Sequence, residues 1–430
     1  MKKYFKRLIE QDLKDYLEII GAVLIVGPKW CGKTTTAEQY ANSVLKLQDP
    51  DNRKSYLQLA EIKPSKLLEG EKPRLIDEWQ LAPVLWDAVR ISVDNTDSKN
   101  LYIMTGSTTV NEKEIMHSGT GRIHRLLMYP MSLYESGDSN GKISLQELFE
   151  DEKLDIDGIE SFLTLEDLLH VSCRGGWPET LNIKDKNKQL KIATSYVEHI
   201  CHTDVSEIDD VKRNPDKIKL LLQSYARNIS TLAKNTNILK DVNSTYTTLD
   251  KSTFYSYITV LKNLYVIDDI TGWSPNIRSK NAIRRGPKRQ FIDPSIATAV
   301  LDLTPEKLIY DLNTFGFIFE NLCIRDLKIY SQSLGGKIYY YHDNSDLEVD
   351  CVIQLNNGNY GLIEFKLGSN EEEKGAKNLL KIDKLIKDKI KSKTDVNIPE
   401  PSFLAIVTGG KFAYTREDGI KVIPIGCLRN

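Results

Sequence analysis

The chain has 430 residues, 40% of them hydrophobic, and a formal net charge of −2, so it is long enough for about two or three domains with ordinary cores. This charge excludes a protein that is basic throughout, so any nucleic-acid surface has to be local. No apolar run approaches the roughly 20 residues that cross a bilayer, and the six cysteines form no paired motif. We therefore expect a reduced, cytoplasmic protein without membrane contact.

A glycine-rich loop follows the first predicted strand. Residues 21–26 form a short apolar, β-branched run, and residues 34–42 have the composition of a helix start. The loop between them fits the pattern G-x-x-x-x-G-K-[ST], in which backbone N–H groups and a lysine surround phosphates and a hydroxyl reaches Mg²⁺. An ordinary strand–turn–helix connection is the alternative. We predict an ATP site at Gly27, Pro28, Lys29, Trp30, Cys31, Gly32, Lys33, Thr34 and Thr35, with Thr34 as a magnesium ligand.

Another short apolar strand, at residues 74–76, ends in two acids. In phosphate-loop ATPases, an aspartate here holds the Mg²⁺ shell, and a neighbouring polar side chain orients the attacking water. We therefore predict Asp77 as a magnesium and nucleotide ligand and Glu78 as the catalytic residue. The strand at 101–105 ends just before Ser107, whose hydroxyl is a candidate to orient the water or the γ-phosphate. A strand-ending turn is the alternative for Ser107.

Two arginines of segment 119–125 are candidates for a γ-phosphate sensor. An arginine finger raises the rate of phosphoryl transfer by ~10³–10⁵. We predict that Arg122 or Arg125 has this role, in its own chain or in a neighbouring one. The alternative is that both are solvated surface arginines, and the sequence does not distinguish between the two residues.

The organisation of the first two thirds follows from hydrophobic periodicity. Residues 21–135 alternate strands with helices, which predicts a parallel sheet covered on both faces. Residues 136–159 are rich in glycine, serine and acids and predict a loop at a domain junction. Residues 160–265 are mainly helical by period. The helix predicted at 248–265, followed by a short strand and a basic loop, has the order of a winged helix.

The basic loop lies between Asp269 and Asp293, where the sequence contains no acid. Basic side chains at a wing neutralise phosphates and give salt-dependent binding. A loop that docks on an acidic partner or on a neighbouring domain is the alternative. We predict a nucleic-acid surface, for DNA more than RNA, formed by Arg278, Lys280, Arg284, Arg285, Lys288 and Arg289.

A second group of charged residues lies in the last third. A helix is predicted at 314–330, and strands at 337–341, 347–353 and 360–366. The order helix Glu320, then Asp350, then Glu364-x-Lys366 across a hairpin is the pattern of the PD-(D/E)xK nucleases. In that chemistry Asp350 and Glu364 ligate Mg²⁺, Lys366 positions or deprotonates a water, and Glu320 completes the catalytic group. A Glu–Lys ion pair on a solvated strand face is the alternative.

The motifs together resemble a family of known architecture. Besides the loop and the acidic strand end, the resemblance rests on residues 105–107, 121–122, 131–135, 174–179 and 291–294. The sequence is similar to a bacterial and archaeal family of AAA-type P-loop ATPases whose C-terminal, uncharacterised domain resembles the restriction-endonuclease-like PD-(D/E)xK superfamily. The resemblance implies an α/β fold with a parallel ATPase sheet, a helical and winged-helix middle, and a nuclease-like end.

We accordingly predict an AAA-type ATPase domain at 1–155, a helical and winged-helix domain at 156–300, and a nuclease-like domain at 301–430. The predicted function is a magnesium-dependent ATPase that binds and processes nucleic acid, with a homo-oligomer as a possible assembly. The alternative is an ATP-controlled switch or scaffold whose nuclease-like domain is inactive and binds a partner. A small-molecule phosphotransferase is a weaker alternative, because it leaves the C-terminal half without a role.

Overall fold

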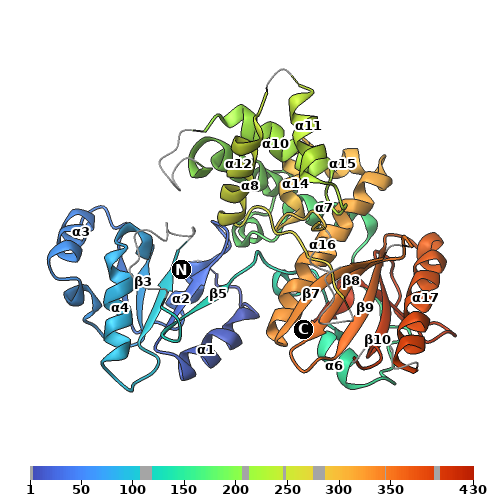
Figure 1. The fold of residues 1–430 in the computed structure, drawn as a ribbon, viewed down its shortest axis with the longest axis horizontal. Coiled ribbons are helices and arrows are strands. Elements are labelled where there is room, and N and C mark those ends of the chain that lie inside the picture. The colour runs from blue at the N-terminus through green and yellow to red at the C-terminus, as the bar shows by residue number, and fades with distance from the viewer. Residues whose placement is uncertain are drawn as a thin grey trace.

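The computed structural model describes residues 3–106, 119–205, 213–245, 248–274, 286–343, 345–391 and 398–430. Figure 1 shows a parallel sheet at the N-terminal end, a helical middle, and a second sheet at the C-terminal end. The predicted α/β fold class is confirmed. The predicted site residues Ser107, Arg278, Lys280, Arg284 and Arg285 lie outside the described residues.

The N-terminal sheet is entirely parallel and has the order β2-β3-β4-β1-β5. It contains β1 (Ala22–Val26), β2 (Ser43–Lys46), β3 (Arg74–Asp77), β4 (Tyr102–Thr105) and β5 (Ile123–Leu127). The helices of this region are α1 (Ile9–Ile19), α2 (Lys33–Glu38), α3 (Arg53–Ile62), η1 (Pro64–Leu68), η2 (Trp79–Leu81) and α4 (Val84–Asp94).

Both faces of this sheet are covered, which explains why its strands are apolar on consecutive residues. Along β1, Leu24 packs in one core with residues of α3 and α4, while Val23 and Ile25 pack in another with residues of α1. Successive side chains of a strand point to opposite faces. Because all strands are parallel, their carboxyl ends meet at one edge, which is where the functional residues gather.

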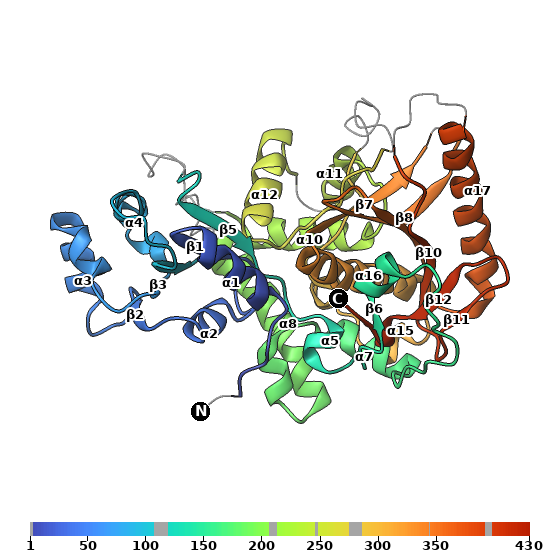
Figure 2. The same ribbon diagram turned by 90° about the horizontal axis from the view of Figure 1, so that it is seen from below.

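Residues 133–174 pack on the C-terminal region. They form α5 (Leu133–Ser136), β6 (Ile143–Ser144), α6 (Leu145–Glu150) and α7 (Leu165–Arg174), and β6 pairs in parallel with β13 (Leu428–Arg429) beside the C-terminus (Figure 2). The polar composition that predicted a loop here partly belongs to helix caps. The Ser144 hydroxyl, for example, accepts from the N–H of Glu147 at the start of α6.

The middle region consists mainly of helices. These are η4 (Pro178–Asn182), α8 (Lys186–His199), the π-helix η5 (Ile200–Asp204), α10 (Pro215–Arg227), α11 (Asn235–Asn243), α12 (Lys251–Asn263) and α14 (Pro294–Val300). After α12 the chain forms isolated antiparallel bridges, Ile267 with Phe291 and Ile270 with Lys288. This order of helices and a paired return segment agrees with the predicted sequence of elements, and the winged helix itself stays a prediction.

The C-terminal sheet is mixed and has the order β11-β12-β10-β9-β8-β7. Its main elements are α15 (Pro305–Leu308), α16 (Leu312–Ser333), β7 (Gly336–His342), β8 (Glu348–Leu355), β9 (Tyr360–Lys366), η6 (Ser369–Glu371), α17 (Glu372–Lys391), β10 (Phe403–Thr408), β11 (Tyr414–Thr415), β12 (Lys421–Pro424) and η7 (Ile425–Cys427). Strands β7, β8 and β9 are antiparallel, as the predicted hairpin requires. Helix α16 covers the inner face of this sheet and α17 the outer face (Figure 1).

Helix α16 touches all three regions. The Gln332 side chain donates to the carbonyl of Leu127 at the end of β5, at 3.0 Å. The Asn321 side chain donates to the carbonyl of Phe291 in the middle region, at 2.9 Å. Its apolar side packs against β7, β8 and β9. Among the helices of the described residues, including this one, none has the length and apolarity to cross a membrane.

Candidate functional site

The glycine loop turns sharply at its first and sixth residues. Gly27 has φ 144°, and a Cβ there would lie 2.2 Å from the carbonyl oxygen of Met128. Gly32 has φ 100° and precedes the first residue of α2. Both conformations strongly favour glycine, and at Gly27 no side chain fits. The motif glycines are therefore explained by local geometry, independently of any ligand.

The Lys33 side chain is folded into the loop. Its ammonium donates to the carbonyls of Gly27, at 3.0 Å, and Pro28, at 2.8 Å, and the residue is only 6% exposed. In the described part of the chain Lys33 has no carboxylate partner. Because charge-assisted bonds to an anion are stronger than bonds to neutral carbonyls, a phosphate bound at this loop is a better acceptor for this ammonium.

Two hydroxyls converge on Asp77 beside the loop. The Thr34 hydroxyl donates to Asp77 Oδ1 at 2.7 Å, and the Thr105 hydroxyl donates to the same oxygen at 2.6 Å. The strand register explains this, since Thr105 lies opposite both Ile25 of β1 and Asp77 of β3. A carboxylate and a hydroxyl are the hard oxygen ligands that Mg²⁺ takes beside substrate phosphates. The residues at this edge therefore fit a magnesium ion.

Glu78 follows Asp77 in a left-handed backbone conformation, with φ 55°. Burial raises the pKa of its carboxyl. The Gln80 amide donates to Glu78 Oε2, and Gln80 itself lies against the end of β4, where a Cβ on Gly106 would be 2.7 Å from Gln80 Oε1. Gln80 thus bonds to Glu78 and packs close to the strand end that precedes Ser107. The sequence analysis did not single out Gln80.

The tip of the loop contacts the middle region. Lys29 Nζ lies 2.7 Å from Asp204 Oδ1 at the end of η5. The Trp30 ring meets the His199 ring edge-on, with centroids 5.5 Å apart. Thr35, by contrast, is exposed on α2. Lys29 and Trp30, predicted as nucleotide-binding residues, are therefore held by the helical region beside the loop.

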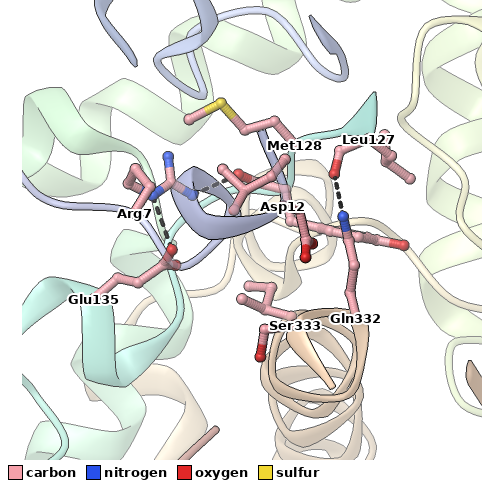
Figure 3. A pocket seen from close by; sticks show the side chains of 10 residues that line it. Arg7, Asp12, Leu127, Met128, Glu135, Gln332 and Ser333 are labelled. Atoms are coloured by element: carbon pink, nitrogen blue, oxygen red, sulfur yellow. Dashed lines mark hydrogen bonds and ion pairs between the residues drawn. The ribbon is translucent and has the colours of Figure 1, made fainter. Parts of the chain in front are cut away.

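Arg7 is a site residue that the sequence analysis missed. Its guanidinium donates to the carbonyls of Cys31, at 2.7 Å, and Tyr129, at 2.8 Å, and forms an ion pair with Glu135 at 3.1 Å. Figure 3 shows Arg7 pointing toward Glu135 beside a cavity of about 10 Å³, which has room for a single water and not for a substrate. Arg7 fastens the loop to the segment after β5. No motif marks it, because its partners lie far along the chain.

Arg122 and Arg125 do not lie at the nucleotide edge. Arg122 precedes β5, and its carbonyl accepts from the N–H of Ala22 at the amino end of β1, opposite to the loop. Its side chain pairs with Asp94 at 2.6 Å. Arg125 lies in mid-strand, over the ring of Trp86 at 5.6 Å. Their contacts therefore give no support to a γ-phosphate sensor, and this role, within the chain or toward a neighbouring one, stays a prediction.

The C-terminal charged residues do come together. Lys366 Nζ lies 2.7 Å from Glu364 Oε2 and 3.5 Å from Asp350 Oδ2. The N–H of Phe365 donates to Asp350 Oδ2 at 3.0 Å, across the hairpin of β8 and β9. The predicted juxtaposition of Asp350, Glu364 and Lys366 is thus present. Glu364 and Lys366 also form an ion pair, but Glu364 is buried, so this pair does not lie on the solvated strand face of the alternative.

A second lysine enters this cluster from the middle region. Lys288 Nζ lies 2.6 Å from Glu320 Oε1, 3.0 Å from Asp350 Oδ1 and 3.2 Å from Glu348 Oε1, and its side chain is 2% exposed. Within the described ranges, no three or more His, Cys, Asp or Glu side chains are arranged to hold a metal ion. The predicted magnesium ligands Asp350 and Glu364 face ammonium groups here, so their arrangement does not fit a resident metal.

The position of Lys288 also corrects the predicted nucleic-acid surface. Lys288 is buried among carboxylates, and Arg289 is 4% exposed, with its guanidinium 3.2 Å from Asp269 and donating to the carbonyl of Ala233 at 2.8 Å. Both side chains are therefore buried and paired within the chain, not exposed as a nucleic-acid surface requires. The absence of acids near them in the sequence indicated exposure, but acids of α16 and β8 pair with Lys288, and Asp269, at the start of the acid-free stretch, pairs with Arg289.

Burial and neighbouring charges shift the pKa values of the carboxyl groups in this cluster in opposite directions. Burial raises the pKa of Glu320 to about 8, despite the adjacent Lys288. Burial likewise raises the pKa of Glu364 to about 8, helped by the nearby Asp350. For Asp350 burial also acts upward, but Lys288 and Lys366 together outweigh it and lower its pKa to about 2. Asp350 is therefore the carboxylate most firmly held in its charged form.

The glycine loop, the convergence of Thr34 and Thr105 on Asp77, and the sheet order give the N-terminal unit a P-loop ATPase fold. Residues 21–137 match a family described as an AAA domain. Residues 165–307 and 315–428 match two domains of unknown function, DUF8612 and DUF4143. No curated protein matches the chain.

Several solved structures resemble the chain at low sequence identity. The Walker-type ATPase PABY2304 of Pyrococcus abyssi is 16% identical over 69% of this chain and 96% of its own, with a TM-score of 0.43. A structure of Drosophila ORC bound to DNA is 13% identical, covering 65% and 91%, with a TM-score of 0.20. The STAND protein PH0952 from Pyrococcus horikoshii, with a tetratricopeptide repeat sensor, is 12% identical, covering 76% and 48%, with a TM-score of 0.21. At these scores the likenesses carry no argument about function.

Proposed function

We propose that this chain is a magnesium-dependent ATPase and that its middle and C-terminal regions form a switch controlled by the bound nucleotide. One observation carries the ATPase proposal. Thr34 of the glycine loop and Thr105 of β4 both donate to Asp77 at the edge where the Lys33 ammonium is held by carbonyls alone. Lys33, which suits phosphate, therefore lies at the same edge of the sheet as Thr34 and Asp77, which suit Mg²⁺.

Each group at this edge has a task that its chemistry suits. Lys33 exchanges its two carbonyl acceptors for phosphate oxygens of ATP, and the loop N–H groups bind the remaining oxygens. Thr34 and Asp77 hold a magnesium ion, which when bound neutralises charge on the phosphates. Glu78 accepts a hydrogen bond from the attacking water and orients it, and Gln80 positions Glu78.

The switch is supported by contacts around the loop. Lys29 and Trp30 pack on α8 and η5, and Arg7 ties Cys31 to the segment after β5. A loop that adjusts to phosphates therefore changes the surroundings of the helical region. Lys288 favours this proposal over DNA cleavage, since it places a second buried ammonium on Asp350 and Glu320, where the nuclease pattern has none. Nucleic-acid binding by Arg278, Lys280, Arg284 and Arg285 stays a prediction.

The experiment combines two assays on the full chain. Hydrolysis of ATP is measured with Mg²⁺ for the wild type and for Lys33→Ala, and we expect turnover only in the wild type. Supercoiled and linear DNA are then incubated with Mg²⁺ or Mn²⁺, with and without ATP. We expect no cleavage; cleavage that disappears in both Asp350→Ala and Lys366→Ala would instead establish a nuclease and contradict the switch.

A further inference from the structure

We propose that the Lys288 ammonium takes the place of a divalent cation in the C-terminal cluster, so that the wild-type chain excludes metal there while Lys288→Ala carries a new divalent-cation site. This inference concerns Glu320, Glu348 and Asp350 and does not depend on ATP hydrolysis.

The position of Lys288 is fixed by its backbone. Its N–H donates to the carbonyl of Ile270 at 2.9 Å, and its carbonyl accepts from the N–H of Ile270 at 3.1 Å. The side chain then crosses from this middle-region bridge to α16 and β8, where it becomes 2% exposed. The backbone of Lys288 is thus fixed by hydrogen bonds, and its buried ammonium is fixed by carboxylates. Lys288 is therefore a structural counter-ion, unlike a solvated surface lysine beside acids.

The carboxylates surround Lys288 as ligands surround a cation. Oxygens of Glu320, Asp350 and Glu348 lie 2.6, 3.0 and 3.2 Å from Nζ. These distances suit N–H···O bonds. Oxygen ligands lie roughly 2.0–2.1 Å from Mg²⁺ and 2.3–2.6 Å from Ca²⁺, so the Asp350 and Glu348 oxygens are too far away for either ion. The site therefore fits an ammonium as it stands, and its carboxylates have to approach by up to about 1.2 Å to ligate a metal.

Electrostatic repulsion prevents Lys288 and a divalent metal ion from occupying the carboxylate cluster together. Asp350 lies between Lys288 and Lys366, at 3.0 and 3.5 Å. A divalent ion beside both ammoniums would face repulsion at short range in a buried place, where such repulsion is weakly screened. Removing Lys288 takes the nearer of the two ammoniums away from the charged Asp350, and carboxylates are the ligands preferred by Mg²⁺, Ca²⁺ and Mn²⁺.

The test measures binding of Mn²⁺ to nucleotide-free protein by electron paramagnetic resonance, in an Asp77→Asn background that removes the loop site. We expect no tight Mn²⁺ binding with Lys288 present, and one Mn²⁺ per chain after Lys288→Ala. Addition of Asp350→Asn to Lys288→Ala should abolish that binding. Mn²⁺ binding to the Lys288 protein that disappears with Asp350→Asn would overturn the proposal, as would a folded Lys288→Ala protein without Mn²⁺ binding.

Thermal unfolding gives an independent readout. Free Mn²⁺ at ~100 times its dissociation constant shifts the folding equilibrium by about 100-fold, so Mn²⁺ should raise the melting temperature of Lys288→Ala and not that of the Lys288 protein. If Lys288→Ala does not fold, Lys288→Ala with Glu348→Gln removes one positive and one negative charge together, leaves the space of the ammonium open and keeps Glu320 and Asp350 as ligands. The same Mn²⁺-dependent rise is expected for it, and its absence would overturn the proposal.

Discussion

The two charged sites of this molecule use the same residue types in opposite ways. At the N-terminal sheet edge, Lys33 is held by neutral carbonyls and Asp77 by neutral hydroxyls. In the C-terminal cluster, Lys288 and Asp350 are held by each other and by further charged groups. Each site buries a lysine and an aspartate, but only the first leaves their charges for a ligand to neutralise.

The comparison shows that a group of catalytic-looking residues is not enough to indicate a ligand site. What matters is whether the charges are already compensated within the chain. Removing one partner of a buried ion pair is costly, because the other charge stays buried without compensation. Removing a buried lysine that donates to neutral carbonyls costs less, because only ordinary hydrogen bonds are lost. Substitutions at the two sites should therefore affect different properties of the protein, and the following predictions test that difference.

The largest effect is expected on stability, for Lys288→Ala. Its removal leaves Glu320, Glu348 and Asp350 without their shared cation, and we expect a loss of about 3–5 kcal/mol in the free energy of unfolding. Urea unfolding followed by circular dichroism measures it. Lys288→Arg, which keeps the charge, is the matched control and should lose less. Equal losses for both variants would indicate that shape, and not charge, stabilises the cluster.

Lys33→Ala should show the opposite profile. We expect ATP turnover to fall by about 10²–10³-fold, because a charge that meets the transferred phosphate is lost. The free energy of unfolding should change by no more than about 1 kcal/mol, since only bonds to carbonyls are removed. Steady-state hydrolysis and urea unfolding, measured on the same preparations, provide both values. A large destabilisation without loss of turnover would contradict the comparison.

Arg7→Ala should affect both properties moderately. The guanidinium joins Cys31 of the loop to Tyr129 and Glu135. Without it, Glu135 still accepts from the N–H groups of Leu8 and Ser132, so we expect a loss of about 1–3 kcal/mol in stability, less than for Lys288. A less firmly held loop should also raise the KM for ATP. Arg7→Lys retains the charge but not the forked contacts, and it is expected to recover part of the stability and little of the KM.

The smallest effect is expected at the tip of the loop. Asp204→Asn removes an ion pair with Lys29, whose side chain is 33% exposed, so the change in stability should stay within about 1 kcal/mol. If the helical region follows the nucleotide, the fluorescence change of Trp30 on ATP binding should decrease in this variant. Trp30→Phe identifies the signal, and an unchanged response in Asp204→Asn would count against the switch.

Sequence predicted the features that depend on neighbouring residues. The glycine loop, the acids after β3 and the Glu364-x-Lys366 hairpin are local patterns, and the structure places their residues at strand ends or on a shared hairpin. Lys288 shows where such reasoning fails. A basic stretch without nearby acids indicates exposure, yet its neutralising partners lie on α16 and β8, 32 to 62 positions away. Arg7 carried no signal at all, because its contacts are to distant backbone carbonyls and to Glu135.

Helix α16 connects the two sites physically. The side chain of its Gln332 donates to the carbonyl of Leu127. Met128, which follows Leu127 in the chain, donates its N–H to the carbonyl of Val26, directly before the glycine loop. Twelve residues earlier the same helix carries Glu320 against Lys288, about 18 Å away at 1.5 Å per residue. A continuous helix is stiff along its axis, so a displacement at Gln332 is carried to Glu320. The Lys288 cluster therefore lies along one helix from the residue that contacts the strand end next to the glycine loop.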